Sequence, residues 1–412
     1  MKSVIVIGGG VIGLCIAERL VHEGFAVTLI ERDRIAAGAS YGNAAGFAFP
    51  EIMPLASTAT MRKAVKWFLD PLGSFTVVPQ DLPATLGWLT RFALAARKPV
   101  FERSRATLAA LMQLEHQTLP LTHQRTGLGK MIRLLGALHV YENRAQYQRD
   151  LENWRFREQH GIQFEALEGE ALHDFQPGLA KQVVAGIFAP DYPSVTNPYE
   201  YCTALHHFNQ EQGIRCHYAQ VVDVKPAEQG VTVSLQGGDV LTADKVVIAA
   251  GAWSAQLADK LGDKVPLIGE RGYNTTLPES AFPELKCTLF FAEHGFVMAP
   301  LENAVRVGGA SEIASLQRPP NYRRSANMLA KAKQLVPGLG MEGGEQWMGH
   351  RPTLPDTLPV ISPATVSPDV IYAFGHGHLG LTLASSTAQL VLELIQQREP
   401  SIDVSALRVR RF

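Results

Sequence analysis

The sequence predicts an α/β fold: a Rossmann-like domain on a parallel sheet, interrupted by an inserted α+β domain built on an antiparallel sheet. Three observations predict it. Residues 2–31 read as strand, glycine-rich turn, helix and strand, and residues 370–396 as strand, second glycine-rich turn and helix. Between them, residues 265–309 carry short apolar segments separated by turn residues, a pattern that is typical of antiparallel strands.

The first 31 residues form a complete βαβ pattern. Apolar, β-branched residues 3–7 predict a strand, residues 11–23 a helix, and residues 25–30 a second strand that Glu31 closes. Gly8, Gly10 and Gly13 have the G-x-G-x-x-G spacing, which permits a tight turn, close approach of the backbone to a pyrophosphate and tight helix–strand packing. The helix N-terminus favours phosphate, and Glu31 can accept hydrogen bonds from a ribose. The unit therefore predicts a dinucleotide site rather than a glycine-rich turn without a ligand.

Residues 38–46 follow this acid and are rich in Gly, Ala, Ser and Asn. The composition suits a backbone that passes close to a flat ligand, although it is also that of a flexible loop. Residues 56–127 are predicted to be mostly helical, with apolar three- and four-residue spacing over residues 85–97 and 105–123. Basic residues beside aromatic ones at 62–69 would suit a peripheral membrane contact, but a solvated helix face over core aromatics is the interpretation we favour.

The remaining segments alternate between predicted helices and strands. Helices are predicted over residues 144–160, 167–173, 199–212, 322–336 and 381–396, and strands over residues 131–141, 183–189, 245–250 and 370–374. Residues 214–224, 231–235 and 240–241 predict a small antiparallel layer, and residues 265–277, 289–291, 295–300 and 304–309 a separate sheet. Two nucleotide-type turns at opposite ends predict a discontinuous binding domain (residues 1–55, 144–262 and 345–412) with a substrate domain inserted (residues 56–143 and 263–344).

Composition excludes several classes of protein. The net charge of −1 gives no global field that would attract nucleic acid. The four cysteines, Cys15, Cys202, Cys216 and Cys287, are scattered, which argues against a zinc site or a disulfide scaffold and fits a reducing compartment. No metal site is predicted. No run of about 20 apolar residues is present, so we expect a cytoplasmic protein, with peripheral contact at the inner face of a membrane as the alternative.

Taken together, residues 4–13, 38–46, 247–254, 272–273, 349–356 and 375–380 resemble the FAD-dependent D-amino-acid oxidase group, nearest to the bacterial D-amino-acid dehydrogenases. The resemblance covers nearly the whole chain. It implies FAD as the cofactor, bound non-covalently because no cysteine lies in a segment expected at the flavin ring. The cofactor-binding residues that it implies, together with those of the first turn, are Gly8, Gly10, Val11, Ile12, Gly13, Glu31, Arg32, Ser40, Asn43, Ala44, Ala45, Gly46, Val221, Gly251, Trp253, Gly375, Gly377, His378, Leu379 and Gly380.

The resemblance also implies two catalytic residues. Arg351 matches the arginine that binds the substrate carboxylate, a role that suits the planar guanidinium fork, whereas the alternative is a structural arginine tied to an acid such as Asp356. Tyr273 matches a tyrosine near the substrate, although a core tyrosine with a satisfied hydroxyl is the alternative and Arg271 is a competing candidate. Three histidines, at 350, 376 and 378, could act as bases, but histidines in glycine turns more often make local hydrogen bonds.

The resemblance implies oxidative deamination of a D-amino acid to a 2-oxo acid and ammonia, by hydride transfer to flavin N5. One alternative is a cyclic secondary amino acid of the D-proline or hydroxyproline type, for which apolar Phe47, Phe49 and Ile52 would suit a ring over the flavin. Another is a non-catalytic FAD-binding subunit of a larger complex. A NAD-dependent dehydrogenase is disfavoured because residues 34–46 and 375–380 would then have no role. The electron acceptor is open among a quinone, a protein and oxygen.

Overall fold

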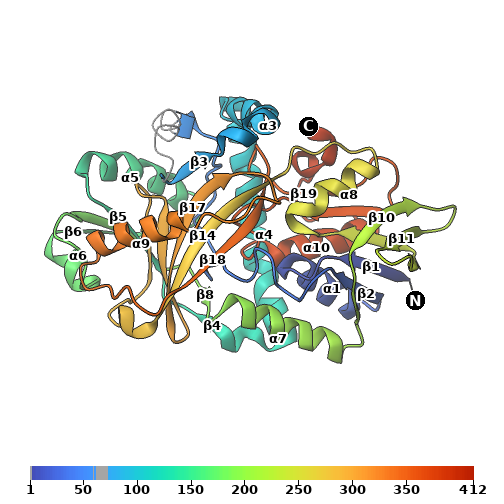
Figure 1. Ribbon diagram of the computed structural model, residues 1–412, viewed down its shortest axis with the longest axis horizontal. Helices are drawn as coiled ribbons and strands as arrows, with labels where there is room; N and C mark the ends of the chain where they lie inside the picture. The colour runs from blue at the N-terminus through green and yellow to red at the C-terminus, as the bar shows by residue number, and fades with distance from the viewer. Residues whose placement is uncertain (1, 59, 62–72) are drawn as a thin grey trace.

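The computed structural model of the chain describes residues 2–58, 60–61 and 73–412, which are arranged around two main sheets (Figure 1). The sheet that contains the first strand lies on the right of Figure 1, and the sheet that contains β14 lies on the left. The predicted basic and aromatic segment at 62–69 falls outside the described residues. Within the described ranges, no helix is both long enough and apolar enough to cross a membrane.

The first sheet has six strands in the order β19-β20-β13-β1-β2-β9. All neighbours pair in parallel except β19, which runs antiparallel to β20. The strands are β1 (Ser3–Ile7), β2 (Ala26–Glu31), β9 (Arg215–Tyr218), β13 (Lys245–Ile248), β19 (Val360–Pro363) and β20 (Val370–Phe374). Because β1 lies between β2 and β13, the glycine turn that follows it opens at the carboxyl ends of neighbouring parallel strands, where α/β sheets bind ligands.

Side chains of a strand alternate between the two faces of this sheet, and different elements pack on each face. Val4 and Val6 pack into a core shared with α1 and α10, whereas Ile5 and Ile7 pack into a core shared with the three-stranded sheet β10-β11-β12 and α8. These elements and the neighbouring helices are α1 (Val11–His22), α4 (Lys98–Thr126), α7 (Pro198–Glu211), α8 (Ser254–Lys260), α10 (Ala384–Ile395), β10 (Val221–Pro226), β11 (Val231–Leu235) and β12 (Val240–Ala243).

Helix α10 begins against a carboxylate from α4. Glu115 is fully buried, and its Oε2 and Oε1 accept hydrogen bonds from the N–H groups of Ser386 at 2.7 Å and Ser385 at 3.3 Å. These N–H groups lie in the first turn of α10, which lacks intrahelical acceptors for them. Burial raises the pKa of Glu115 to about 7.

The second sheet is mixed and has nine strands, in the order β18-β14-β17-β16-β15-β5-β7-β6 with β3 paired to β17. Its strands are β3 (Phe75–Val77), β5 (Ala137–Tyr141), β6 (Glu165–Glu168), β7 (Ala185–Ala189), β14 (Ile268–Pro278), β15 (Thr288–Phe291), β16 (Phe296–Leu301), β17 (Ala304–Ile313) and β18 (Glu345–Thr353). The helices around it are α3 (Leu82–Ala95), α5 (Arg144–Glu158), α6 (Glu170–Phe175) and α9 (Arg323–Leu335). A short pair, β4 (Ile132–Arg133) and β8 (Ser194–Val195), stands apart.

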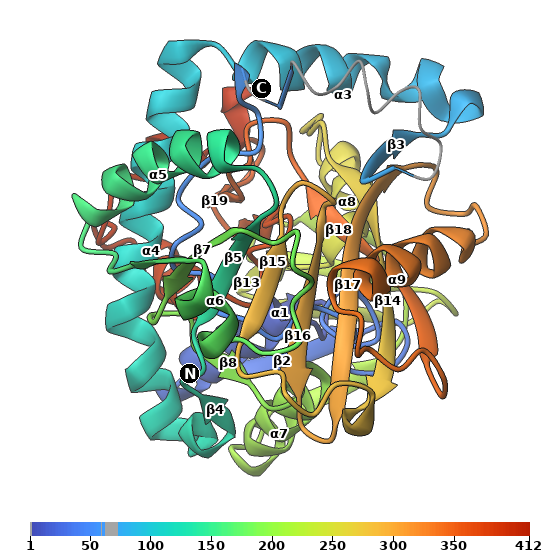
Figure 2. The same cartoon turned by 90° about the vertical axis from the view of Figure 1, so that its left-hand side faces the viewer.

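Alternation on β5 and β15 separates a core face from a cavity face. Leu138 and Leu289 pack into a core shared with α9 and α6, which lie over one face of the sheet in Figure 2. Their neighbours His139 and Phe290 belong to the opposite face and line the cavity described below. The predicted fold class, a Rossmann-like domain combined with a domain on a largely antiparallel sheet, is confirmed.

The structure divides the chain between the sheets differently from the predicted boundaries. Strands β6 and β7, expected in the nucleotide domain, pair beside β5 in the nine-stranded sheet, and β18 pairs there with β14. Strand β9, expected in the small antiparallel layer, instead pairs in parallel with β2. Short apolar segments carry the period of a strand but nothing that identifies its partner, so composition could not assign them.

Two local predictions also need correction. The strand predicted over residues 131–141 is split into β4 and β5, and Gly136 between them has φ +74°, a left-handed conformation that ends the extended run. The helix predicted over residues 167–173 begins later, because residues up to Glu168 continue β6 and Gly169, with φ +59°, separates that strand from α6.

Candidate active site

A cavity of about 710 Å³ is lined by the carboxyl-end turns of the six-stranded sheet and by the inner face of the nine-stranded sheet. Most of the residues predicted for the site line it. From the predicted cofactor set these are Gly8, Gly10, Val11, Ile12, Glu31, Arg32, Ser40, Asn43, Ala44, Gly46, Val221, Gly251, Trp253, Gly377, His378 and Gly380. Both predicted catalytic residues, Tyr273 and Arg351, line it too.

Four residues of the predicted cofactor set do not line the cavity: Gly13, Ala45, Gly375 and Leu379. A Cβ on Gly13 would lie 1.9 Å from the carbonyl oxygen of Gly8, and a Cβ on Gly375 would lie 2.3 Å from the Leu354 side chain. Ala45 and Leu379 are buried in the main core. These positions therefore shape the turns that carry the cavity wall.

The N-terminus of α1 presents free donors to the cavity. Ser40 Oγ accepts a hydrogen bond from the Val11 N–H at 3.0 Å, while the N–H groups of Gly10 and Ile12 donate to no acceptor among the described residues. A Cβ on Gly10 would meet only Ser40 Oγ, at 3.3 Å. This open, N–H-rich helix end fits a phosphate group.

Glu31 is held in place beside this turn. Its Oε2 accepts the Gly9 N–H at 2.7 Å and its Oε1 accepts the Asp33 N–H at 2.9 Å. Each carboxylate oxygen keeps a further lone pair, so Glu31 can still accept from ribose hydroxyls. Nearby, the Arg32 guanidinium lies 4.3 Å from the centre of the Trp253 ring, and this pair forms part of the wall on the same side as Val221.

The loop at 40–46 is fastened to the nine-stranded sheet by residues that the sequence analysis missed. Arg306 of β17 donates from Nη1 to the Asn43 carbonyl oxygen at 2.7 Å and from Nε to Thr276 Oγ1 at 3.0 Å. Asn274 of β14 donates from Nδ2 to the Gly42 carbonyl oxygen at 2.8 Å. Burial lowers the pKa of Arg306 to about 10. In the sequence, this role could have been suspected because Arg306 is a charged residue inside an otherwise apolar strand pattern.

The turn after β20 offers fewer donors than predicted. The N–H groups of Gly377 and Leu379 are engaged by the carbonyl oxygens of Pro352 and His376. The N–H groups of His378 and Gly380 donate to no acceptor within the described ranges, so they are the ones that can serve a ligand. Gly377 has φ +56°, which favours glycine at this position.

Arg351 reaches the cavity from β18 with part of its guanidinium free. Its Nη1 donates to Glu270 Oε1 at 2.8 Å and to the Ala310 carbonyl oxygen at 2.9 Å, and Nη2 makes a long hydrogen bond of 3.4 Å to the Gly309 carbonyl oxygen. No hydrogen bond from Nε to a described residue is formed. The Nε–Nη2 edge therefore retains two donors with the spacing of a carboxylate.

Gly272 makes room for this arginine. A Cβ at Gly272 would lie 2.3 Å from Arg351 Nη2 and 2.4 Å from its Cζ, so the guanidinium occupies the space that a side chain would take. The partner of Arg351 is Glu270, and Asp356, considered from the sequence, pairs instead with Arg411 at 2.7 Å. Sequence neighbourhood therefore pointed to the wrong acid.

Arg271 is not a second candidate for the carboxylate site. It is fully buried, does not line the cavity and pairs with Glu312, while its guanidinium also donates to the carbonyl oxygens of Ser315, Arg318 and Pro319. The part of β14 that lines the cavity here consists of Gly272, Tyr273 and Asn274.

Tyr273 lines the cavity, but its hydroxyl is engaged elsewhere. The hydroxyl donates to Glu312 Oε2 at 2.5 Å and accepts the Asn321 N–H at 3.1 Å. Burial, together with the neighbouring Glu312, raises the pKa of Tyr273 above its ordinary value. The ring rather than the hydroxyl is thus available to a ligand, as in the alternative of a core tyrosine with a satisfied hydroxyl.

The three histidines considered as bases differ in their surroundings. His376 is buried, its Nε2 lies 2.9 Å from Thr387 Oγ1, and burial lowers its pKa to about 3. Burial lowers the pKa of His350 to about 4, and the ring packs edge-on against Trp253 with centroids 5.6 Å apart. His378 lines the cavity with its side chain exposed there, and its pKa is lowered by the surrounding protein atoms and by Arg351, against the opposing effect of Glu270 and Glu51. All three are therefore neutral imidazoles at pH 7.

A nucleotide-type turn with free N–H groups, an acid at the tip of β2 and a second glycine-rich turn that lines the same cavity are features of a dinucleotide-dependent oxidoreductase. More narrowly, the chain belongs to the family of FAD dependent oxidoreductases, whose pattern residues 3–394 match. It is accordingly an FAD-dependent oxidoreductase, and the resemblance noted in the sequence is confirmed. When bound, FAD would supply the acceptor for two electrons and a proton.

Relatives and solved structures cover the chain end to end. It is 29% identical to a D-amino-acid oxidase from Bradyrhizobium diazoefficiens, with 100% of this chain and 99% of the relative covered, and 28% identical to a D-amino acid dehydrogenase from Vibrio cholerae with the same coverage. Its fold is similar to that of glycine oxidase from Geobacillus kaustophilus, with a TM-score of 0.77 at 23% identity over 100% of both chains. L-proline dehydrogenase from P. horikoshii gives a TM-score of 0.75 at 18% identity, covering 100% of this chain and 97% of that one.

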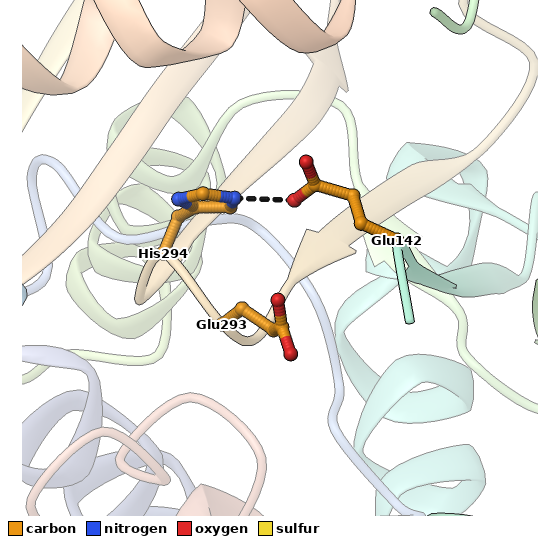
Figure 3. A group of neighbouring side chains, drawn as sticks. All are labelled: Glu142, Glu293 and His294. Atoms are coloured by element: carbon orange, nitrogen blue, oxygen red, sulfur yellow. Dashed lines mark hydrogen bonds and ion pairs between the residues drawn. The ribbon is translucent and has the colours of Figure 1, made fainter. Parts of the chain in front are cut away.

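A separate group of titratable side chains lies on the β15–β16 turn and at the end of β5: Glu142, Glu293 and His294 (Figure 3). None of the three lines the cavity. His294 Nε2 lies 2.5 Å from Glu142 Oε1, and Gln182 donates to the other oxygen of Glu142 at 3.0 Å. These contacts tie the turn to β5.

Proposed function

We propose that the protein oxidises a D-amino acid at its α-carbon, with hydride transfer to N5 of non-covalently bound FAD, and that water then hydrolyses the imine to a 2-oxo acid and ammonia. The observation that carries this proposal is the free Nε–Nη2 edge of Arg351 inside the cavity. A guanidinium edge pairs with a carboxylate through two parallel hydrogen bonds, which fixes both the charge and the orientation of an amino acid.

The chain's own residues would do three things for this reaction. Arg351 binds the carboxylate, and Glu270 holds Arg351 in position through Nη1. The neutral imidazole of His378 lies in the same part of the cavity and places no positive charge beside the substrate amine, which must be uncharged to release hydride. The free N–H groups of Gly10, Ile12, His378 and Gly380 would favour negative charge on the cofactor. No cysteine is among the residues that line the cavity, which supports non-covalent binding.

The names of the relatives support D-amino acids, since both are enzymes of that substrate class. The argument for a cyclic amine from Phe47, Phe49 and Ile52 is wrong, because all three are buried in the main core and none lines the cavity. Ala48 and Glu51 of that segment line it instead. We also propose that the six-stranded sheet carries the cofactor and the nine-stranded sheet the substrate.

The test is an anaerobic screen of D- and L-amino acids, with both forms of proline included, for loss of the oxidised flavin absorbance in the isolated protein. We expect bleaching by D-amino acids. Bleaching by L-amino acids alone would contradict the proposal on configuration. No bleaching by any amino acid would favour the non-catalytic FAD-binding subunit.

A further inference from the structure

The cavity has a second polar region that the cofactor site and the carboxylate site do not use. Glu51, His139, Asp150, Arg157 and Tyr192 all line it. They come from the segment after the loop at 40–46, from β5, from α5 and from the link that follows β7. Asp150 and Arg157 are seven residues apart on α5, which places them on one face of the helix.

Arg157 is buried but only partly satisfied. Only 6% of the residue is exposed, its Nε donates to the Pro50 carbonyl oxygen at 2.7 Å, and its Cζ lies 4.6 Å from the centre of the Trp154 ring. Nη2 is 3.9 Å from Glu51 Oε2, which is an ion-pair distance but too long for a hydrogen bond. Nη1 is buried and donates to no partner among the described residues. Nη1 has no surface open to the cavity, so the donor that a ligand can reach is Nη2, which makes no hydrogen bond to the described residues.

His139 is also buried and only partly satisfied. Its ring stacks on Phe290 with centroids 4.4 Å apart and meets Trp154 edge-on at 4.9 Å, and its Nε2 is buried without a hydrogen-bond partner. Burial lowers the pKa of His139 to about 4, so the ring is neutral at pH 7. Asp150, in contrast, is satisfied, because it accepts from the Tyr141 hydroxyl at 2.5 Å and from Asn153 Nδ2 at 2.9 Å.

This region is electrostatically linked to the carboxylate site. The charges that act on His378 include Glu270 and Arg351 from the carboxylate site and Glu51 from the second region. All four residues, Arg351, His378, Glu51 and Arg157, line one cavity, so a ligand held by Arg351 can extend toward Glu51 and Arg157. The opposite charges of Glu51 and Arg157 offset each other, so a charged side chain gains little there. An uncharged group can accept from Arg157 and donate to Glu51.

We propose that Glu51, His139 and Arg157 form a subsite for the substrate side chain, and that it selects amino acids whose side chain ends in an uncharged group that both donates and accepts hydrogen bonds, a hydroxyl or a carboxamide. The proposal rests on the proposed function and specifies its substrate. An aliphatic side chain would leave Nη2 of Arg157 without an acceptor, and sites with buried polar groups reject analogues that cannot pair with them.

The test compares isosteric substrates in anaerobic flavin reduction: D-homoserine with D-norvaline, D-asparagine with D-leucine, and 4-hydroxy-D-proline with 4-methyl-D-proline. The wild type should prefer the polar member of at least one pair about tenfold or more. Arg157→Met should lower kcat/KM for that polar member by about 10- to 100-fold and leave its aliphatic partner within about twofold, as expected for one hydrogen bond to a charged group. Arg155→Met is the matched control, because Arg155 is exposed on the same helix.

A binding measurement gives a second readout without turnover. Succinamate and 4-methylpentanoate correspond to asparagine and leucine without the amino group, so neither can be oxidised at a C–N bond. Succinamate should perturb the oxidised flavin spectrum at lower concentration than 4-methylpentanoate, and Arg157→Met should abolish the difference. If Arg157→Met does not fold with FAD bound, Glu51→Gln serves instead, and it should also weaken the polar preference.

The outcomes separate this inference from the proposed function. If D-amino acids bleach the flavin but the wild type does not prefer the polar member of any pair, the subsite is wrong and the proposed function stands. The subsite is also wrong if Arg157→Met, like the control Arg155→Met, changes kcat/KM for polar and for aliphatic substrates by the same factor. If no amino acid bleaches the flavin, both fail.

Discussion

Replacing Arg351 with alanine is the sharpest test of the proposed chemistry. The guanidinium uses Nη1 for Glu270 and for the Ala310 carbonyl oxygen, and leaves Nε and one Nη2 hydrogen for a ligand. The variant thus removes the proposed carboxylate partner and also leaves Glu270 without its cation. Burial by itself would raise the pKa of Glu270, but Arg351 and a hydrogen bond from Ser311 bring it below its ordinary value. The two effects must be measured separately.

The magnitude follows from the loss of one partner of a desolvated charge pair, which costs about 2–5 kcal/mol. At about 1.4 kcal/mol per decade, Arg351→Ala should lower kcat/KM for an amino acid by about 30- to several-thousand-fold. Arg351→Lys should recover only part of this loss, because an ammonium group lacks the planar fork. The content of FAD should not change, since the cofactor does not need this charge to bind.

The assay is anaerobic flavin reduction with an amino acid and with its decarboxylated amine, for the wild type and the variant. Arg411→Ala is the control, because it also breaks a buried arginine–carboxylate pair, with Asp356, but away from the cavity. Arg351→Ala should remove the preference for the acid over the amine, whereas Arg411→Ala should lower stability and keep that preference. If Arg351→Ala discriminates between acid and amine as well as the wild type does, Arg351 does not bind the carboxylate.

Three further predictions concern the cofactor site and stability. Gly10→Val should give a folded apoprotein with an unchanged circular dichroism spectrum and no FAD, because its Cβ would meet only Ser40 Oγ, at 3.3 Å, while the side chain takes the space that the pyrophosphate needs; retention of FAD would refute this. Gly13→Val should fail to fold, because its Cβ would lie 1.9 Å from a carbonyl oxygen. Arg306→Met should raise the dissociation constant of FAD by about tenfold or more, measured by flavin fluorescence, because the hydrogen bond to Asn43 that fastens the loop is lost; unchanged affinity would count against it. The pKa of Glu115 is about 7 in the folded state and ordinarily 4.5. Between these pH values the folded protein holds a proton that the unfolded chain has lost. The free energy of unfolding should therefore fall by about 3 kcal/mol as pH rises through this range. Urea titrations at pH 5 and pH 8 should show this fall in the wild type and not in Glu115→Gln. An equal change in the free energy of unfolding in both proteins would exclude the prediction.

The sequence by itself determined the local parts of the site. The first βαβ unit, its three glycines and Glu31 could be predicted because each depends on neighbouring residues: a strand, a turn and a helix within 31 positions. The terminal glycine turn could be found in the same way, whereas Arg351 was indicated by the resemblance of residues 349–356 to the family. The two glycine turns open on one cavity because β1 and β20 run in the same direction in the six-stranded sheet, whereas Arg351 reaches that cavity from the other sheet.

Only the tertiary structure decided which groups are paired and which are free. Arg271 and Arg351 are both candidates in the sequence, but the packed chain buries Arg271 against the segment at 315–319 and places Arg351 in the cavity over Gly272. The partner of Arg351 comes from β14 and that of Asp356 from the C-terminal segment, because ion pairs form between elements that the sheet order brings together. In the sequence, Arg157 is one of several polar residues of the helix predicted over 144–160. Its burial against Trp154 with an unpaired guanidinium nitrogen is a property of the packed chain, which no local pattern encodes.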